Sequence, residues 1–370
     1  MVRFLKILLI FIVALLFTGG ALLALDETKE TPPKEEVDAA SAGTVPLTYN
    51  PRYNFTAFGI ESLHPFDGCK YMKIHDALIK AKLRTEDNFL CPKEIERSQL
   101  ELVHTSHYLN ALKDSKTVAR ILEIPQVAVL PAEAVDWRVL RPMRYATGGT
   151  LLACRAALKH GIAINIGGGF HHADTNSGGG FCVYADVPLA IETLLREKAL
   201  KTALIVDTDA HQGNGFANIV RTAQPDTHVL DFFDSSIYPF DFVEEDMSVP
   251  LERKTGWSEY SQELAKNLPV AIERFKPDLI VYNAGCDVLH DDPLSTLQLL
   301  PSDLKERDMF VIKTARKHNI PVAMVLAGGY SKQAAAAQGA SIISIIEAFD
   351  KKPESDSSGS GLKDESKGRD

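Results

Sequence analysis

Acidic and imidazole side chains alternate in the segment Asp207-Thr208-Asp209-Ala210-His211. Residues two apart point to the same face of an extended chain, so Asp207, Asp209 and His211 can all point the same way. Carboxylate oxygens and imidazole nitrogens both suit a zinc ion, and a third protein ligand would leave a position open for water or substrate. The alternative interpretation is a solvated acidic turn, but the segment directly follows a buried-strand pattern, which favours a metal site.

A further carboxylate is available in the segment Asn283-Ala284-Gly285-Cys286-Asp287, which is followed by Asp291 and Asp292. One carboxylate from this loop would complete a set of two aspartates and one histidine. Taken alone, the segment is an ordinary turn.

Two more segments carry groups suited to acid and base chemistry. His171 and His172 follow Gly167-Gly168-Gly169-Phe170, and two adjacent imidazoles can exchange protons near neutral pH. Tyr330 follows Ala327-Gly328-Gly329, where paired glycines can present a phenol to a cavity. A surface loop and a core tyrosine are the respective alternatives.

Each of these four segments follows a short apolar run rich in Val, Ile and Leu, as expected for buried parallel strands. The runs cover residues 162–166, 203–206, 279–282 and 322–326. Helix-period segments lie among them at 148–158, after Thr147 as a cap, and at 188–197, 258–275, 302–318 and 332–348. The alternation predicts an α/β fold with a mostly parallel sheet flanked by helices. In such sheets, ligands bind where the strands end at their carboxyl side.

The composition narrows the class of protein. The 370 residues include 49 acidic and 40 basic side chains, a formal net charge of −9, with 45% hydrophobic residues. This chain can bury a sizeable core, and its acidic balance argues against direct nucleic-acid binding. Its five cysteines lack CxxC spacing, which argues against a disulfide scaffold and a thiolate zinc cluster. Any metal should therefore use histidine and carboxylate ligands.

The two ends differ from the body in composition. Residues 7–25 carry no charge and follow Arg3 and Lys6, which is typical of a signal anchor or a cleavable signal peptide within residues 1–25. Residues 26–43 have six acidic and two basic side chains and predict a flexible stalk, and residues 351–370 predict a disordered tail. The charges flanking the apolar run favour a membrane-anchored chain with a lumenal or extracytoplasmic body. A secreted protein and a nuclear or cytoplasmic one are the alternatives.

The four segments, in this order and spacing, resemble the zinc-dependent histone deacetylases of the arginase-deacetylase fold. The resemblance covers about residues 46–348, so we expect one catalytic domain over residues 44–350. Further matches resemble class IV of that family, the group of histone deacetylase eleven. They are Leu63-His64-Pro65-Phe66-Asp67, Leu140-Arg141-Pro142-Met143-Arg144, Thr147-Gly148-Gly149, Gln212-Gly213-Asn214 and Tyr282-Asn283-Ala284-Gly285.

The resemblance implies a metal site and its cofactors. Asp209, His211 and Asp287 would hold Zn²⁺, which polarises the amide carbonyl and activates water. Family members also bind monovalent cations near the metal loop, so K⁺ is a further expected ion. A binuclear ureohydrolase such as arginase would need another Asp where this chain has Gly213, which favours a single metal.

The resemblance also implies roles for the other polar residues. His172 would be the general base and then the acid, while His171 would support the developing charge. Tyr330 would donate a hydrogen bond to the carbonyl oxygen, and Asp207 would orient His171. Asn214 stands where many members have a carboxylate, and this neutral partner should leave the pKa of His172 lower.

A substrate tunnel would be walled by Gly180 and Phe181 on one side and by Tyr238 on the other, although both aromatic residues could instead belong to the core. The loop at residues 123–126 lacks the aspartate with which other classes of this family bind the substrate backbone at the rim of the tunnel. Class IV shares that absence and is associated with removing long fatty acyl groups as well as acetyl.

The predicted function is therefore zinc-dependent hydrolysis of N-acyl-lysine amides in an acylated protein or peptide, including long-chain deacylation. The alternatives are an amidohydrolase acting on acetylated polyamines or other small amides, and a catalytically silent acyl-lysine binding protein. A silent protein should lack a metal ligand, a histidine or the tyrosine, and none of these is missing. The sequence leaves the oligomeric state open.

Overall fold

The computed structural model describes residues 32–36, 43–55, 59 and 65–351. In this part of the chain, eight strands form one sheet in the order β2-β1-β3-β8-β7-β4-β5-β6, and every paired neighbour runs parallel. The predicted α/β fold is thus confirmed. The strands are β1 (Leu47–Thr48), β2 (Phe89–Leu90), β3 (Ile162–Asn165), β4 (Ala203–Asp207), β5 (Thr227–Asp234), β6 (Met247–Leu251), β7 (Leu279–Asn283) and β8 (Val322–Val325).

The four strands whose ends carry reactive side chains are neighbours in the centre of this sheet, in the order β3-β8-β7-β4. All four are buried along their whole length, which explains their continuous apolar sequences. The register pairs Asp207 at the end of β4 with Asn283 at the end of β7. Because parallel strands end at the same edge, their following loops share one side of the molecule.

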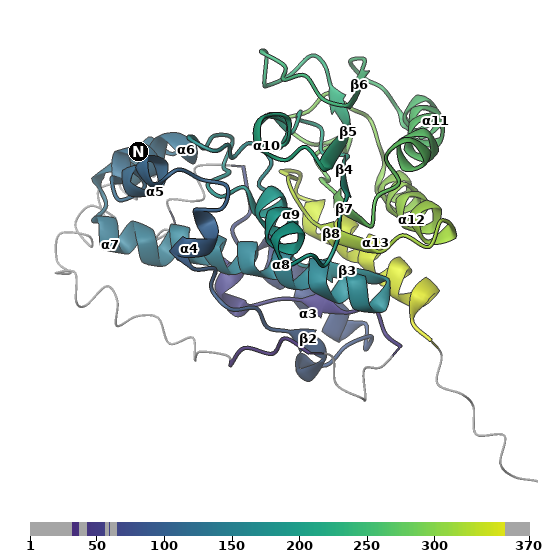
Figure 1. Cartoon of the computed structure of the whole chain (residues 1–370), viewed down its shortest axis with the longest axis horizontal. Coiled ribbons are helices and arrows are strands. Elements are labelled where there is room, and N and C mark those ends of the chain that lie inside the picture. The colour runs from purple at the N-terminus through teal and green to yellow at the C-terminus, as the bar shows by residue number, and fades with distance from the viewer. Residues whose placement is uncertain (1–31, 37–42, 56–58, 60–64, 352–370) are drawn as a thin grey trace, which may run out of the picture.

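Helices cover both faces of the sheet (Figure 1). One face is covered by α8 (Arg141–His160), α9 (Asp186–Arg196) and α10 (Asn214–Ala223). On the other face, α11 (Trp257–Phe275), α12 (Pro301–Lys317), α13 (Ala334–Phe349) and α3 (Lys70–Lys80) pack side by side. The shorter elements are η2 (Pro51–Tyr53), η4 (Glu86–Asn88), α4 (Arg97–Leu100), α5 (Ser106–Ala111), α6 (Ser115–Ile121), η5 (Pro125–Val129), α7 (Ala132–Val135) and η6 (Asp136–Leu140).

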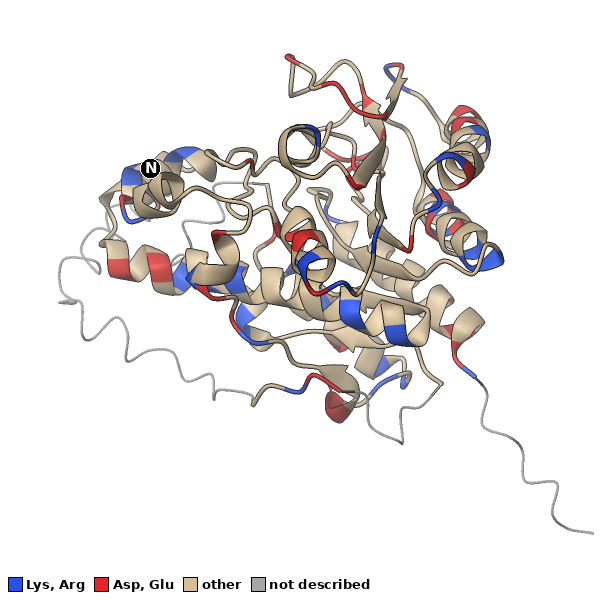
Figure 2. Ribbon diagram, viewed as in Figure 1, with Lys and Arg blue, Asp and Glu red and all other residues tan. Residues whose placement is uncertain are grey.

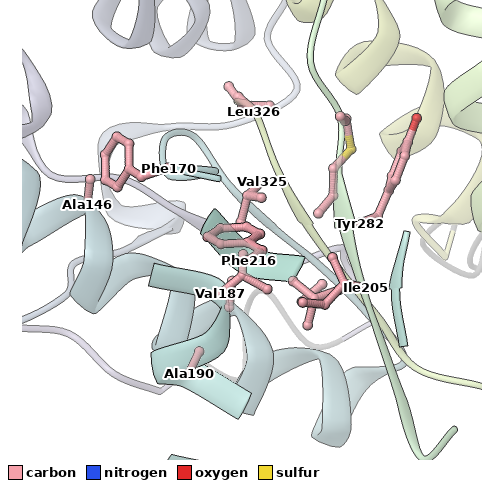
Figure 3. Packing of buried hydrophobic residues seen from close by; sticks show 14 of the residues in the cluster. Ala146, Phe170, Val187, Ala190, Ile205, Phe216, Tyr282, Val325 and Leu326 are labelled. Atoms are coloured by element: carbon pink, nitrogen blue, oxygen red, sulfur yellow. The ribbon is translucent and has the colours of Figure 1, made fainter. Parts of the chain in front are cut away.

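The core lies between these layers, while charged residues occupy the outer helices. In Figure 3, the ring of Phe216 from α10 packs between Val187 of α9 and Val325 of β8, and all three are buried. Basic and acidic positions both appear on α11 and α12 (Figure 2).

The long helix α8 begins earlier than the sequence predicted. Thr147 was expected to cap a helix at residue 148, but α8 starts at Arg141. Thr147 lies inside the helix, where its Oγ1 donates to the carbonyl oxygen of Met143 at 2.8 Å. The following glycines are explained by close packing instead: a Cβ on Gly148 would lie 2.2 Å from the Lys93 carbonyl oxygen, and one on Gly149 would lie 1.8 Å from the Tyr53 hydroxyl.

The prediction of a membrane-anchored chain is corrected. Among the residues that the structure describes, no helix is both long and apolar enough to cross a bilayer. The segment 1–25 on which that prediction rested lies outside the described residues, as do most of the predicted stalk and all but the first residue of the predicted tail. Within the stalk, Lys34 forms an antiparallel bridge with Cys91.

Candidate active site

Two aspartates and a histidine from neighbouring strand ends converge on one point. Asp209 and His211 follow β4, and Asp287 follows β7. Their ligand atoms all lie within 4.8 Å of one another, and all three residues are buried. Nδ1 of His211 lies 3.1 Å from Oδ1 of Asp209 and 3.0 Å from Oδ2 of Asp287. Three donors at these separations can share a single metal ion.

The charges in this cluster also suit a cation. Burial and the neighbouring Asp209 carboxylate raise the pKa of Asp287 to about 7. Burial opposes the protonation of His211, but hydrogen bonds to Asp209 and Asp287 outweigh it and raise its pKa well above the ordinary value. Two buried carboxylates thus face one imidazole, and a divalent cation would balance their charge.

The backbone orients both carboxylates. Asp209 accepts hydrogen bonds from the backbone N–H of His211 at 3.0 Å and of Gly328 at 2.9 Å, while Asp287 accepts one from Ala210 at 2.7 Å. A Cβ on Gly328 would lie 2.6 Å from Oδ2 of either aspartate, and one on Gly285 would lie 2.2 Å from Oδ2 of Asp209. Glycine is needed at both positions because the chain passes so close to the carboxylates.

His171 lies between two carboxylates, with its Nε2 3.6 Å from Oδ1 of Asp209. Its Nδ1 lies 3.0 Å from Oδ2 of Asp207, which also accepts a hydrogen bond from Nδ2 of Asn283 at 2.9 Å. Burial alone would lower the pKa of His171, but the carboxylates of Asp209 and Asp207 raise it to about 9. These two carboxylates therefore favour the protonated form of His171.

The pKa of His172 shifts in the opposite direction from that of His171, although the ring centroids of the two residues are only 4.2 Å apart. Its Nδ1 lies 2.7 Å from Oδ1 of Asn214, the first residue of α10. An amide oxygen can only accept, so Nδ1 carries the proton and Nε2 is left as the basic nitrogen. Burial, together with the charges of His171 and His211, holds the pKa of His172 well below the ordinary value.

The loop after β8 brings Tyr330 to the same edge. Its ring centroid lies 6.3 Å from that of His211, and the two rings are nearly perpendicular. Burial and the carboxylates of Asp209 and Asp287 raise the pKa of Tyr330 well above its usual range. The phenol therefore keeps its proton and can donate a hydrogen bond.

Two residues that support this loop were missed by the sequence analysis. Lys70, the first residue of α3, is fully buried and donates to the carbonyl oxygens of Ala327 at 2.8 Å and Gly328 at 3.1 Å. Asp292 accepts from the backbone N–H groups of Tyr330 and Ser331. No local pattern marks Lys70, whereas Asp292 was noted only as part of a turn.

A narrow, mostly apolar hollow with several aromatic rings lies beside this cluster, and its lining includes Gly180 and Phe181, the two residues predicted to form one wall of a substrate tunnel. Phe181 packs against Phe55 and Phe66, with ring centroids 5.1 Å and 4.9 Å apart. The lining residues are Tyr53, Phe55, Phe66, Tyr71, Pro142, Met143, Ala146, Gly168, Gly169, Phe170, His171, Gly180, Phe181, Cys182, Ala327, Gly328 and Tyr330.

Tyr238 lies apart from this hollow. It is not among the lining residues, its side chain is 42% exposed, and its ring stands edge-on to His172 at a centroid separation of 5.0 Å. Tyr238 is thus a partly exposed neighbour of His172, and its hydroxyl would lie 3.4 Å from a Cβ on Gly179.

The parallel sheet and the cluster at its carboxyl edge define a hydrolase of the deacetylase type. The histone deacetylase domain model matches residues 64–346, and the chain belongs to the histone deacetylase family. The expected family is thus confirmed. Class IV and a fatty acyl substrate go beyond this finding.

Related sequences agree with the family assignment. Histone deacetylase 2 of Arabidopsis thaliana is 40% identical over 294 residues, which cover 79% of this chain and 76% of that protein. The acetoin utilization protein AcuC of Staphylococcus aureus is 27% identical and covers 72% of this chain and 73% of its own length.

Solved structures show the same fold at low sequence identity. The HDA15 HD domain superposes with a TM-score of 0.66 at 19% identity, covering 82% of this chain and 91% of that chain. The acetylpolyamine aminohydrolase from Burkholderia pseudomallei gives a TM-score of 0.63 at 18% identity, covering 83% of this chain and 99% of that chain. The arginase-deacetylase fold expected from the sequence is confirmed.

Proposed function

We propose that residues 44–350 form a single zinc-dependent catalytic domain that hydrolyses N-acyl-lysine amides in proteins or peptides. The observation that carries this proposal is the convergence of Asp209, His211 and Asp287 beside His172 and Tyr330 at one edge of the sheet. The 40% identical relative named a histone deacetylase supports a protein lysine substrate over a free polyamine.

Zinc is the metal that best fits two carboxylates and one imidazole with room for further ligands. When bound, it would polarise the amide carbonyl and lower the pKa of its water. K⁺ is a further ion that the family resemblance implies.

The protein's own groups would then handle protons and charge. His172, neutral at pH 7, accepts the proton of the attacking water at Nε2 and passes it to the leaving lysine amine. His171 remains positively charged and stabilises the negative charge that develops at the reacting carbonyl. The Tyr330 hydroxyl donates a hydrogen bond to the carbonyl oxygen.

The hollow favours a short acyl group. Its volume is about 40 Å³, and one ordered water needs roughly 10–15 Å³ on the same measure. Acetyl is small enough for this space, and on this ground we propose acetyl as the preferred acyl group. We nevertheless place the chain in class IV, on its Leu140-Arg141-Pro142-Met143-Arg144 segment and on Asn214 as the partner of His172.

The test compares purified protein on acetyl-lysine peptide, myristoyl-lysine peptide and N-acetylputrescine, with and without zinc. We expect acetyl-lysine peptide to be the best substrate and Tyr330→Phe to lose at least about 100-fold in kcat, as after removal of one oxyanion donor. Exclusive turnover of N-acetylputrescine would instead support the small-amide alternative. Tight acyl-lysine binding without any turnover by the zinc-loaded protein would indicate a silent binder.

A further inference from the structure

The loop that carries Tyr330 has little conformational stability of its own. It joins β8 to α13 without regular structure, and two of its residues have positive φ angles, 47° at Ala327 and 134° at Gly329. A positive φ is disfavoured for a non-glycine residue such as Ala327. The loop must therefore be held in this shape by contacts with other segments.

Asp292 supplies the contact at Tyr330 itself. Its Oδ2 accepts hydrogen bonds from the backbone N–H of Tyr330 at 2.7 Å and of Ser331 at 2.9 Å. Its Oδ1 accepts from the backbone N–H of Leu294 at 3.0 Å, which fixes the carboxylate to its own loop. Asp292 is only 6% exposed, and hydrogen bonds between a carboxylate and backbone N–H groups are among the strong ones.

A second carboxylate holds the other side of the tyrosine. The backbone N–H of Gly328, two residues before Tyr330, donates to Oδ2 of Asp209 at 2.9 Å. Asp209 belongs to the cluster that could bind a metal. Tyr330 thus lies between one backbone contact to the metal cluster and another to Asp292, and these two contacts, together with the hydrogen bonds from Lys70 to Ala327 and Gly328, hold the loop that carries its hydroxyl.

We propose that Asp292 is a positioning residue, which acts on the reaction only by placing the Tyr330 hydroxyl against the substrate carbonyl. This inference rests on the proposed deacylase function. Because the hydroxyl acts on charge that develops in the transition state, misplacing it should lower kcat and leave KM nearly unchanged.

The neighbouring Asp291 provides a matched control. It carries the same charge one residue away and contacts the loop through side chains: its Oδ2 accepts from the side chain of Gln333 at 2.9 Å, and the side chain of Ser331 is its second partner. Asp291→Ala therefore removes an adjacent carboxylate without removing the contact to the backbone of Tyr330.

The experiment is a double-mutant cycle on the full chain with zinc. Asp292→Asn and Asp292→Ala should each lower kcat by about 10- to 100-fold, the cost of misplacing a reacting group by roughly 1 Å. In the Tyr330→Phe background, the same substitutions should cause almost no further loss, since the hydroxyl they position is gone. Asp291→Ala should keep the wild-type kcat. If Asp292→Ala fails to fold, Asp292→Asn alone completes the cycle.

Hydrogen exchange gives a readout that does not depend on turnover. The peptide spanning residues 328–333 should exchange faster in the Asp292 variants than in Asp291→Ala, at equal zinc content. An equal loss of kcat in the wild-type and Tyr330→Phe backgrounds, or unchanged exchange, overturns the positioning role. A wild-type protein that is inactive on every acyl-lysine peptide overturns the proposed function instead, while the exchange rates still decide whether Asp292 holds the loop.

Discussion

The side-chain oxygen of Asn214 lies 2.7 Å from Nδ1 of His172, in a site where the adjacent His171 faces the carboxylate of Asp207. The two imidazoles therefore have partners of different charge. Burial and the charges of His171 and His211 hold the pKa of His172 well below its usual value, whereas the carboxylates of Asp209 and Asp207 overcome the effect of burial on His171 and raise its pKa to about 9. Two adjacent groups with separated pKa values can serve as a base and as a fixed positive charge at the same pH.

Asn214→Asp should change the pH dependence of turnover. A carboxylate next to Nδ1 favours the protonated imidazole and raises the pKa of His172. Since the base works only when unprotonated, the acidic limb of the pH profile of kcat/KM should move to higher pH. The same charge introduced at the exposed Asn110 should leave the profile where it is. An unmoved acidic limb in Asn214→Asp would show that His172 is not the base.

Asp287→Ala should abolish metal binding. The substitution removes one of the three donors that lie within 4.8 Å of one another. We expect zinc content, measured by elemental analysis of the purified protein, to fall from about one ion per chain to a small fraction, and kcat to fall more than about 100-fold. Asp291→Ala, in the same loop, should keep its zinc. Full zinc content in Asp287→Ala would exclude this cluster as the metal site.

The central part of the fold could be predicted from the sequence because its strands are buried on both faces. β3, β4, β7 and β8 are continuous apolar runs, and the sequence placed each within one residue of its observed bounds. β5 was missed because Asp231 and Asp234 interrupt its apolar pattern, although both are buried. β1 and β2 have two residues each, so they depend on neighbouring strands rather than on any pattern of their own.

The site likewise has residues that a local sequence pattern predicts and residues that only the folded chain brings together. Asp209, His211, Asp287, His172 and Tyr330 follow predictable strands, so their convergence follows from the sheet order. Lys70 and Asp292 reach the Tyr330 loop across 257 and 38 residues of sequence, respectively, and such contacts exist only once the chain has folded. Tyr238 stays a prediction as a tunnel residue: it is not among the lining residues of the hollow, but its ring lies 5.0 Å from that of His172.

His104 should make stability depend on pH. In the folded protein its Nδ1 lies 2.9 Å from the Asp174 carbonyl oxygen, and its Nε2 accepts from the backbone N–H of Ala185 at 2.9 Å. This arrangement needs the neutral ring, and burial lowers the pKa of His104 to about 4. A lowered histidine pKa means that stability is fully present above the unfolded value near 6.5 and is lost as the pH falls toward 4.

The measurement is urea unfolding at several pH values. Between pH 7.5 and 4, the free energy of unfolding should fall by up to about 3 kcal/mol more in the wild type than in His104→Gln, because the glutamine has no proton to take up. The segment 174–185 that His104 joins includes Phe181 of the hollow, so acid should also loosen this wall. Parallel pH dependence in the two proteins would show that the stability comes from other groups.

Lys70→Met should destabilise the protein even though it fills a buried position with an apolar side chain. The substitution leaves the carbonyl oxygens of the buried Ala327 and the partly buried Gly328 without the donor that Lys70 provides. A buried polar group that loses its partner costs about 1–3 kcal/mol, and we expect a loss in this range in urea unfolding. Lys73, three residues further along α3, provides the control because it is exposed and pairs with Asp67 at the surface. Lys73→Met should change the free energy of unfolding by less than about 0.5 kcal/mol. Equal effects of the two substitutions would mean that the buried ammonium group of Lys70 does not hold the tyrosine loop.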